Sequence, residues 1–461
     1  MGSIDRARLA TLIERERATY AADHPTSRRL FNEAEHLFGR VPMTWMAMWS
    51  GGFPIYMDDA NGNRVIDVDG NEYVDFALGD TGAMAGHSPA ATVAAVRERV
   101  DAQGGITTML PTADAEWVGA ELSRRFGLPL WSFTLTATDA NRWAIRLARL
   151  VTDRPKILTF AYCYHGSVDE AFAIGGPGGE AVARPGLVGA PVPVSETSRV
   201  AEFNDLADVE SQLAHGDVAA ILTEPALTNI GIVLPEPGFL AGLRDLATRY
   251  GALLMIDETH TFSAGPGGVT RLDGLEPDVV VVGKSIGGGI PSGAYGLSNA
   301  VAQTVEAHPE ADLIDVGGIG GTLAGNALSV AGMRATLEHV LTDDAFTDMV
   351  RLATEFTEGV QQTIDRTGVA WSVSQLGARS EYRFASPAPR TGSDSAAAAD
   401  EEIDEYLHLY LANRGVLITP FHNMALMCPS TSADDVALHT RLFGQAVGEL
   451  EATGHDVGRR G

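Results

Sequence analysis

The sequence predicts an α/β fold in which a mostly parallel sheet is covered by helices on both faces. From about residue 89 onward, short apolar runs alternate with longer stretches of helical periodicity. The runs carry no polar alternation and are shorter than a typical helix, which is the pattern of strands buried on both faces. A different pattern precedes them, because residues 53–76 alternate between apolar and polar side chains, as a half-exposed antiparallel sheet does.

The N-terminal segment predicts a helical arm followed by a small antiparallel sheet. Within residues 1–40, three apolar residues recur at helical spacing, namely Leu9, Leu12 and Ile13. The alternating segment contains an Asn-Gly pair at residues 61–62 and an Asp-Gly pair at residues 69–70. Both pairs favour the tight turns of hairpins.

The rest of the chain predicts strands and helices in alternation. We expect strands at residues 131–136, 156–160, 219–222, 252–256 and 279–282. We expect helices at residues 89–103, 113–126, 139–152, 238–250, 323–366, 401–412 and 433–452, and an exposed loop over the Ser/Ala/Pro-rich residues 386–399. This order predicts a large domain over residues 76–335 and a smaller α+β domain formed by residues 1–75 together with residues 336–461.

The composition excludes several classes of function. The net charge of −27 disfavours binding to nucleic acids or to anionic membranes, because both need basic patches. No apolar stretch approaches the roughly 18 residues of a membrane span, and the charged N-terminus does not predict a secretory signal. Two cysteines, Cys163 and Cys428, cannot form a disulfide framework. We therefore expect a soluble, cytoplasmic, acidic protein.

Lysine is scarce in this chain, and one lysine has a distinctive position. Only two of the 33 basic residues are lysines, Lys156 and Lys284. A lysine amine can form an imine, which an arginine cannot. Lys156 stands between a turn and a strand start, where we expect a solvated strand-edge charge. Lys284 follows the apolar run 279–282, at the carboxyl end of a parallel strand, where folds of this class bind ligands.

The Gly-Lys-Ser of residues 283–285 does not form a nucleotide-binding loop. The first glycine of that motif would fall on residue 278, which is Asp278. The lysine of the motif also opens a helix, and the glycines and proline of residues 287–291 disfavour one.

An acidic residue ends the preceding apolar run. Asp257 closes the run 253–257 and lies 27 residues before Lys284, a separation that accommodates one strand–crossover–strand unit. A carboxylate at a strand end suits pairing with the ring nitrogen of pyridoxal phosphate, which keeps the pyridinium protonated as an electron sink. A helix-capping or surface carboxylate is the alternative.

The phosphate and the aromatic ring of pyridoxal phosphate would need two further features, and the sequence offers both. The small residues that lead into the helix near Asp139 could present the N–H groups of Ala137 and Thr138 to a phosphate. Capping of the helix by Thr138 would use the same donors and remains open. Tyr164 could cover the face of the ring. A metal site at the neighbouring Cys163 is not expected, because no second cluster of ligands lies nearby.

At these residues the chain resembles the class III aminotransferases, of the fold type I group of pyridoxal-phosphate enzymes, and within them the glutamate-1-semialdehyde aminomutase-like branch. The likeness runs from about residue 40 to 445. It rests on seven segments in order: 64–76 (RVIDVDGNEYVDF), 86–87 (GH), 163–166 (CYHG), 223–225 (TEP), 256–259 (IDET), 283–296 (GKSIGGGIPSGAYG) and 321–326 (GTLAGN).

The resemblance implies a role for each matching residue. Lys284 would form the imine link with the cofactor and move the substrate proton, and Asp257 would bind the ring nitrogen. Ala137 and Thr138 would bind the phosphate of the cofactor. Tyr164 would stack on the ring, Thr259 would lie beneath it, and Asn229 would contact the ring hydroxyl with Glu224 close by. Thr322 would contact the phosphate of the neighbouring subunit's cofactor. The last contact implies a homodimer with shared active sites.

Three departures from the family pattern concern the substrate more than the cofactor. The usual Ser-Gly-Thr-Glu-Ala phosphate turn is replaced by residues 136–140 (TATDA), and the usual valine beneath the ring is Thr259. The frequent Ser-Trp-Gly near the substrate is replaced by residues 80–82 (DTG), which removes a large aromatic side chain.

The resemblance implies an aminotransferase that moves an amino group from an amino acid or related amine to a keto acid by a ping-pong mechanism. The alternatives are a glutamate-1-semialdehyde-type 2,1-aminomutase and a racemase or epimerase, which would share every cofactor residue. A carboxylate-bearing substrate would favour a bidentate arginine, for which Arg40, Arg379 and Arg383 are candidates.

Overall fold

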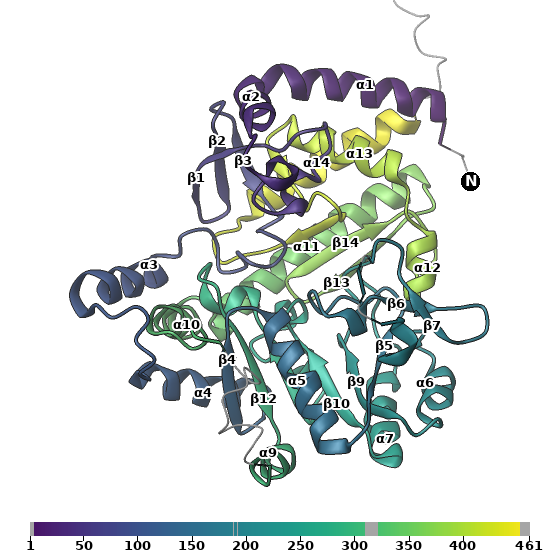
Figure 1. The fold of residues 1–461 in the computed structure, drawn as a ribbon. Helices are drawn as coiled ribbons and strands as arrows, with labels where there is room; N and C mark the ends of the chain where they lie inside the picture. Colours follow the sequence, from purple (N-terminus) through teal and green to yellow (C-terminus); the bar gives the residue numbers. More distant parts are fainter. Residues whose placement is uncertain (1–3, 188, 191, 309–320, 452–461) are drawn as a thin grey trace, which may run out of the picture. The chain divides into compact units, whose positions relative to one another are not determined.

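The computed structural model describes residues 4–187, 189–190, 192–308 and 321–451 (Figure 1). Within these ranges, no helix is both long and apolar enough to cross a membrane. The chain divides into two compact units, each described by itself. Unit 1 comprises Met1–Asp80, Met349–Ala388 and Ala398–Gly461, and unit 2 comprises Thr81–Asp348 and Pro389–Ala397.

Unit 2 is built on a seven-stranded sheet. In spatial order its strands are β4 (Leu130–Thr134), β12 (Gly293–Leu297), β11 (Val279–Val282), β10 (Leu253–Asp257), β9 (Val218–Thr223), β5 (Lys156–Phe160) and β8 (Ser198–Ala201). The pairs from β11 to β8 are parallel, and only β12 runs antiparallel to its two neighbours. The mostly parallel sheet expected from the sequence is therefore confirmed. A separate hairpin joins β6 (Ala173–Gly175) to β7 (Ala181–Ala183).

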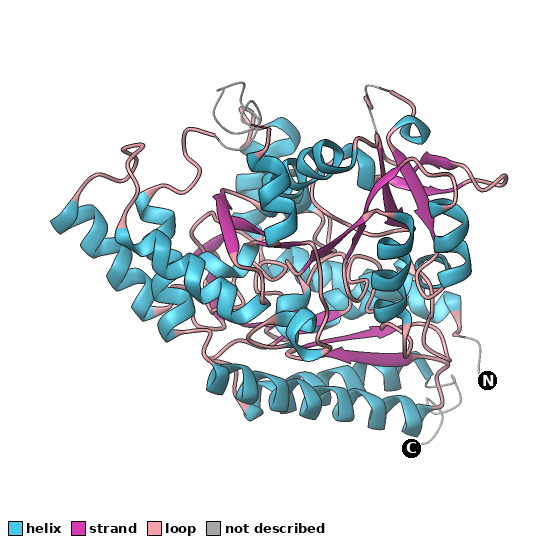
Figure 2. Ribbon diagram, turned by 90° about the horizontal axis from the view of Figure 1, so that it is seen from below, coloured by secondary structure: helices cyan, strands magenta, loops and turns pink. Residues whose placement is uncertain are grey.

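Helices pack against this sheet, as the pattern of fully apolar strands requires (Figure 2). Helix α5 contacts β4, β9, β11 and β12, and helix α7 contacts β9 and β10. The helices of unit 2 are α3 (Ala90–Arg97), α4 (Ala113–Phe126), α5 (Ala137–Thr152), α6 (Leu206–Leu213), α7 (Phe239–Tyr250), α8 (Gly268–Leu272), α9 (Asn299–Glu306), α10 (Ala327–His339) and α12 (Gly392–Ala397). Every residue of β9 and of β11 is buried, which explains their uninterrupted apolar sequences.

Unit 1 contains two smaller sheets and the terminal helices. One sheet has the order β1 (Met57–Asn61), β2 (Arg64–Asp67), β3 (Glu72–Asp75), β15 (Val416–Leu417), and the other has the order β13 (Ser372–Leu376), β14 (Arg379–Arg383), β16 (Met424–Leu426). The helices are α1 (Arg6–Asp23), α2 (Pro25–Glu33), α11 (Asp343–Thr367), whose first turns belong to unit 2, α13 (Glu401–Ala412) and α14 (Ala433–Glu451). The two expected hairpin turns join β1 to β2 and β2 to β3. Leu9, Leu12 and Ile13 are buried, as expected.

The helical stretch expected over residues 323–366 consists of two separate helices, α10 and α11. The guanidinium of Arg125 donates to the carbonyls of Leu337 and Leu341, so the end of α10 is satisfied by a side chain from α4. The hydroxyl of Thr342 then accepts from the N–H of Ala345 at the start of α11. Thr342 and the two aspartates after it are a helix-start signal that could have been found in the sequence.

Three smaller expectations also need correction. The exposed loop expected over residues 386–399 contains α12, with buried residues Gly392 and Ser395. The helix expected over residues 89–103 is an α-helix only over α3, and it continues as a π-helical turn over Glu98–Gln103. Lys156 opens β5, as expected, but it is not fully solvated, since its amine is only partly exposed and pairs with Asp217 at 3.3 Å.

Candidate active site

Two neighbouring strands of unit 2 bring together the two residues that the sequence analysis singles out. β10 ends at Asp257, which pairs in parallel register with Val281 of β11. Lys284 lies two residues beyond the end of β11. Because carboxyl ends of adjacent parallel strands meet at one edge of a sheet, Asp257 and Lys284 share that edge.

Asp257 is held as an anion inside the core. It is only 3% exposed, and its carboxylate accepts from Asn141 Nδ2 at 2.8 Å, from His165 Nδ1 at 2.9 Å and from the N–H of Thr259 at 3.0 Å. Burial would raise the pKa of Asp257, but these hydrogen bonds and the charge of His165 outweigh it and keep the pKa below its usual value. The group can therefore oppose a positive charge placed next to it.

His165 supports this carboxylate from the loop after β5. Burial would lower the pKa of His165, but Cys163 and the Asp257 carboxylate more than compensate, so the pKa lies well above its usual value. The second ring nitrogen, Nε2, is buried and has no hydrogen-bond partner among the described residues. The buried hydroxyl of Thr259 is likewise unpartnered within the described part of the chain. Unpaired buried polar atoms are rare in folded proteins and mark places where a ligand's polar groups fit.

Lys284 has a strained backbone and a fixed amine. Its φ is +50°, in the left-handed region that a residue with a side chain adopts at a cost. Its Nζ lies 2.8 Å from Nε2 of His260, and Nδ1 of His260 lies 3.3 Å from the hydroxyl of Thr81. His260 follows β10 by three residues, so the same strand end supplies Asp257 and the partner of Lys284.

The start of α5 lies where the sequence predicts a phosphate-binding turn, with one correction to its details. The helix begins at Ala137 rather than near Asp139, and its cap is Thr136, whose hydroxyl accepts from the N–H of Asp139. Thr138 therefore does not cap the helix; its hydroxyl accepts from the N–H of Ser167 at 3.2 Å. The N–H groups of the first turn point out of the helix end, where they attract an anion.

The strand that leads to Lys284 approaches this turn closely. A Cβ atom added to Gly283 would lie 3.0 Å from the backbone nitrogen of Ala137 and 2.9 Å from its Cβ. A Cβ atom on Gly166 would meet the hydroxyl of Thr138. Glycine is thus required at both positions because two loops meet the helix end there.

Three more expected residues cluster on the loops after β5 and β9. The N–H of Tyr164 donates to Glu224 Oε1 at 3.4 Å, and the hydroxyl of Thr228 donates to the other oxygen. Burial raises the pKa of Glu224. Asn229 Nδ2 donates to the carbonyl of Tyr162 at 3.3 Å. Tyr164 is therefore linked directly to Glu224, whereas Asn229 bonds to the loop that carries Tyr164 two residues earlier.

The remaining expected site residues lie elsewhere. Thr322 is exposed in unit 2. In unit 1, Arg40 is exposed, with its guanidinium 5.8 Å from the ring centre of Phe31, whereas Arg379 and Arg383 are buried residues of β14. The roles of these four residues stay predictions.

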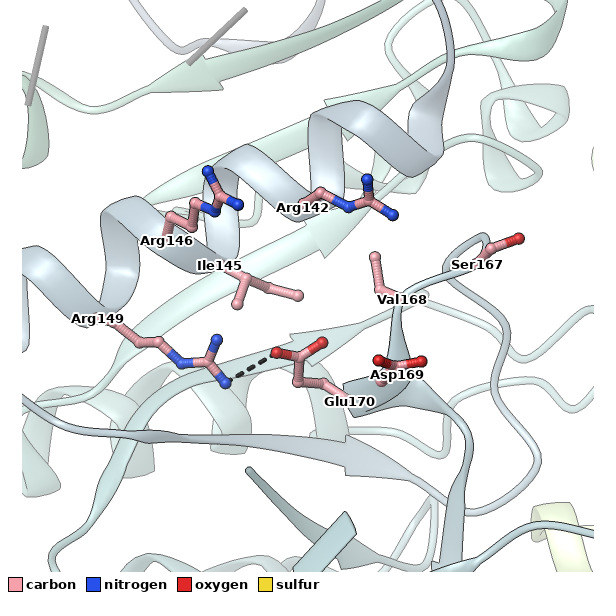
Figure 3. A pocket seen from close by; sticks show the side chains of 8 residues that line it. All are labelled: Arg142, Ile145, Arg146, Arg149, Ser167, Val168, Asp169 and Glu170. Atoms are coloured by element: carbon pink, nitrogen blue, oxygen red, sulfur yellow. Dashed lines mark ion pairs between the residues drawn. The ribbon is translucent and has the colours of Figure 1, made fainter. Parts of the chain in front are cut away.

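A pocket of about 360 Å³ flanks α5 and involves none of the expected site residues (Figure 3). Arg142, Arg146 and Arg149 line it from the helix, and Arg149 pairs with Glu170 at 2.8 Å. Within the described ranges no group of three or more His, Cys, Asp or Glu side chains could hold a metal ion.

Sequence reasoning missed three residues of the site, namely Thr81, Asn141 and His260. Asn141 lies on the buried face of α5 among apolar residues, and a polar residue on such a face is a usable signal. Thr81 and His260 are 179 residues apart, and no spacing rule connects them.

Comparison with protein families and curated sequences gives consistent matches. The family model for class III aminotransferases matches residues 45–443. Glutamate-1-semialdehyde 2,1-aminomutase 2 from Brevibacillus brevis is 33% identical over 419 residues, which cover 88% of this chain and 95% of that protein.

Solved structures show the same likeness. A glutamate-1-semialdehyde-aminomutase from Pseudomonas aeruginosa PAO1, crystallised as a lysine-to-alanine variant in complex with PMP, is 48% identical with a TM-score of 0.94, and covers 97% of this chain and 100% of that one. An omega-transaminase from Sphaerobacter thermophilus is 28% identical with a TM-score of 0.83, and covers 93% of this chain and 98% of that one.

Proposed function

Because the chain belongs to the class III aminotransferase family of fold type I enzymes, which depend on pyridoxal phosphate, we propose that it moves an amino group between adjacent carbons of one substrate, as a 2,1-aminomutase does. The observation that supports this choice is the similarity to proteins of that name, over 95% of the Brevibacillus brevis relative and all of the Pseudomonas aeruginosa chain. It replaces the aminotransferase, which was the first interpretation of the sequence, as the favoured activity.

Residues of unit 2 fit the cofactor. Asp257 supplies an anion for a protonated ring nitrogen, and the first turn of α5 supplies donors for a phosphate. The unpartnered hydroxyl of Thr259 leaves polar capacity among the described residues beside Asp257. When bound, pyridoxal phosphate supplies an aldehyde that binds amines and a ring that accepts electrons from the substrate.

The chain's own residues then have distinct tasks. Asp257, supported by His165 and Asn141, keeps a negative charge at the ring nitrogen. Lys284 holds the cofactor between turnovers, and its free Nζ takes a proton from one carbon and returns it to another. The first turn of α5 fixes the phosphate, and Tyr164 covers the ring.

We propose that an arginine binds the carboxylate of the substrate. Arg379 and Arg383 are the stronger candidates because they are buried. Arg40 is exposed and is the weaker candidate. Replacement of the right arginine should raise KM more than it lowers kcat, since it binds substrate and transition state alike.

The working unit is proposed to be a homodimer in which Thr322 contributes to the partner's phosphate site. Several large apolar side chains of unit 2 are exposed in the single chain, including Met109 at 79%, Leu110 at 70% and Leu323 at 49%. Exposed apolar clusters are typical of interfaces between subunits. Sedimentation analysis should show a dimer, and a monomer at working concentration would contradict this assignment.

The test of the activity separates amino-group shift from transfer. The purified holoenzyme is incubated with glutamate-1-semialdehyde, without any keto acid, and the products are separated by chromatography before mass spectrometry. A 2,1-shift yields an isomer of unchanged mass and does not need an added acceptor. Lys284→Ala should lose turnover by orders of magnitude, whereas Lys156→Ala should retain it.

The second candidate is an aminotransferase, and the likeness to the omega-transaminase favours it. Turnover that depends on pyruvate or 2-oxoglutarate, with one keto product released for each amine formed, would establish it and exclude the shift. A racemase or epimerase would instead exchange the hydrogen on the substrate carbon with solvent and leave the amino group in place.

A further inference from the structure

The amine of Lys284 makes a specific contact that the proposed function does not use. His260 Nε2 lies 2.8 Å from Lys284 Nζ, within hydrogen-bond distance. His260 is 7% exposed, and Lys284, whose amine contacts it, is one of only two lysines in the chain.

The chemistry of the two groups allows one consistent arrangement of hydrogen bonds. The amine of Lys284 can donate an N–H to Nε2 of His260 and keep its lone pair for the aldehyde of the cofactor. The other nitrogen, Nδ1, then carries the proton and can donate to the hydroxyl of Thr81 at 3.3 Å. Thr81 is fully buried, so the chain from Thr81 through His260 to Lys284 is anchored in the core.

The loop that carries His260 is itself fixed. The carboxylate of Glu258 accepts from the hydroxyl of Thr261 at 2.5 Å, and from the N–H and the hydroxyl of Thr270 at 2.6 Å each. The N–H of Ser263 donates to the carbonyl of His260 at 3.2 Å. The imidazole is thus presented to Lys284 from a rigid backbone.

We propose that His260 is a positioning residue for Lys284. Nε2 of His260 holds the amine of Lys284, and Thr81 fixes the imidazole ring through Nδ1. A lysine side chain has a flexible four-carbon stem and loses much rotamer freedom when its amine is aimed at one carbon. A fixed acceptor reduces that cost before the reaction starts. The inference rests on the role that the proposed function gives to Lys284, and it holds whether the enzyme shifts or transfers the amino group.

The test measures how fast Lys284 captures the cofactor. Pyridoxal phosphate is added to cofactor-free, full-length protein, and samples are reduced with borohydride at successive times. The hydride adds to the imine carbon and a proton from water to the nitrogen, which leaves a stable amine link. Peptide mass spectrometry then separates Lys284 from Lys156 without ambiguity, because no other lysine exists.

Three variants and one control define the result. His260→Phe should slow the capture at Lys284 by on the order of ten- to a hundredfold, since it removes the hydrogen bond that aims the amine. His260→Gln keeps an acceptor near the position of Nε2 and should restore most of the rate. Thr81→Val should slow the capture to a lesser degree. His439→Phe, a buried histidine of unit 1, should leave the rate unchanged.

The outcomes distinguish the two proposals. Capture at the wild-type rate in His260→Phe overturns the role of His260, and so does a His260→Gln variant as slow as His260→Phe. If His260→Phe does not fold, the Thr81→Val rate decides, and an unchanged rate there overturns the proposal. Failure of the wild-type protein to capture the cofactor at Lys284 would instead overturn the proposed function.

Discussion

At the scale of single residues, the charge on Asp257 is the feature most open to a direct test. Asp257→Asn keeps the shape of the side chain but removes the anion that three donors stabilise. We expect turnover to fall by on the order of a hundredfold or more, because the ring nitrogen loses its partner. Steady-state kinetics measure the loss. Asp217→Asn, which removes the ion-pair partner of Lys156, is the control and should retain full activity.

Thr259 gives a second prediction at this scale. Its hydroxyl is buried without a partner among the described residues, so Thr259→Val should stabilise the cofactor-free protein by about 1 kcal/mol. The matched variant is Thr261→Val, two residues along, whose hydroxyl donates to Glu258. That variant should destabilise the protein by about 1–3 kcal/mol. Urea unfolding of both variants measures the difference, and equal effects would contradict the assignment of the Thr259 hydroxyl.

The site residues differ in how far the sequence could reveal them. Lys284 and Asp257 follow apolar runs, and parallel strands end at one edge, so their proximity was predictable. The contacts of His165 with Asp257 and of His260 with Lys284 depend on loop conformation and side-chain rotamers. Those are set by packing that no local pattern encodes, so only the structure reveals them.

At the scale of elements, the close approach of β11 to the start of α5 is expected to control phosphate binding. Gly283→Ala would place a Cβ 3.0 Å from the nitrogen of Ala137 and force the turn to move. We expect the affinity for pyridoxal phosphate to fall at least tenfold, since a displaced turn loses about one charge-assisted hydrogen bond. Binding titrations measure this change.

The control for that variant is Gly119→Ala in α4. A Cβ there meets nothing within 4 Å, and alanine favours helix over glycine by up to about 1 kcal/mol. Gly119→Ala should therefore leave cofactor affinity unchanged and raise stability slightly. Equal cofactor affinity in Gly283→Ala and the wild type would show that the close approach does not position the turn.

The strands and helices of unit 2 were easier to predict than their ends. β11 matches the expected range because a fully buried strand leaves an uninterrupted apolar run, and β5, which is buried after its first residue, also matches. The break between α10 and α11 was missed because helical periodicity continues through it. The break depends on Arg125, which is distant in sequence and supplies donors to the end of α10.

At the scale of the whole molecule, two buried histidines of unit 1 link stability to pH. His439 lies among Phe76, Phe356 and Phe443, and neither ring nitrogen has a partner among the described residues. Burial lowers the pKa of His439 to about 3, and burial is also the largest cause that lowers the pKa of His408 to about 4. Both rings are therefore neutral in the folded protein at pH values where the unfolded chain already binds a proton.

The sign of the effect follows from this proton difference. Above pH 6.5 both states leave the rings neutral, so the neutral folded rings carry no penalty there. As pH falls below 6.5, the unfolded state takes up a proton at each histidine and the folded state does not. For each histidine, the free energy of unfolding then falls by about 1.4 kcal/mol per pH unit. This fall continues down to pH about 4 for His408 and about 3 for His439.

His439→Phe tests this account because it keeps an aromatic ring and removes the titrating group. We expect the free energy of unfolding to fall less steeply between pH 6.5 and 4.5 than in the wild type, by about 1.4 kcal/mol per pH unit. At pH 7.5 the variant should be at least as stable, since two unpaired buried nitrogens are gone. Urea unfolding at each pH gives the slope. An unchanged slope would mean that His439 already binds its proton in the folded state, which a ring packed against three phenylalanines with no acceptor could do only by opening unit 1 to water.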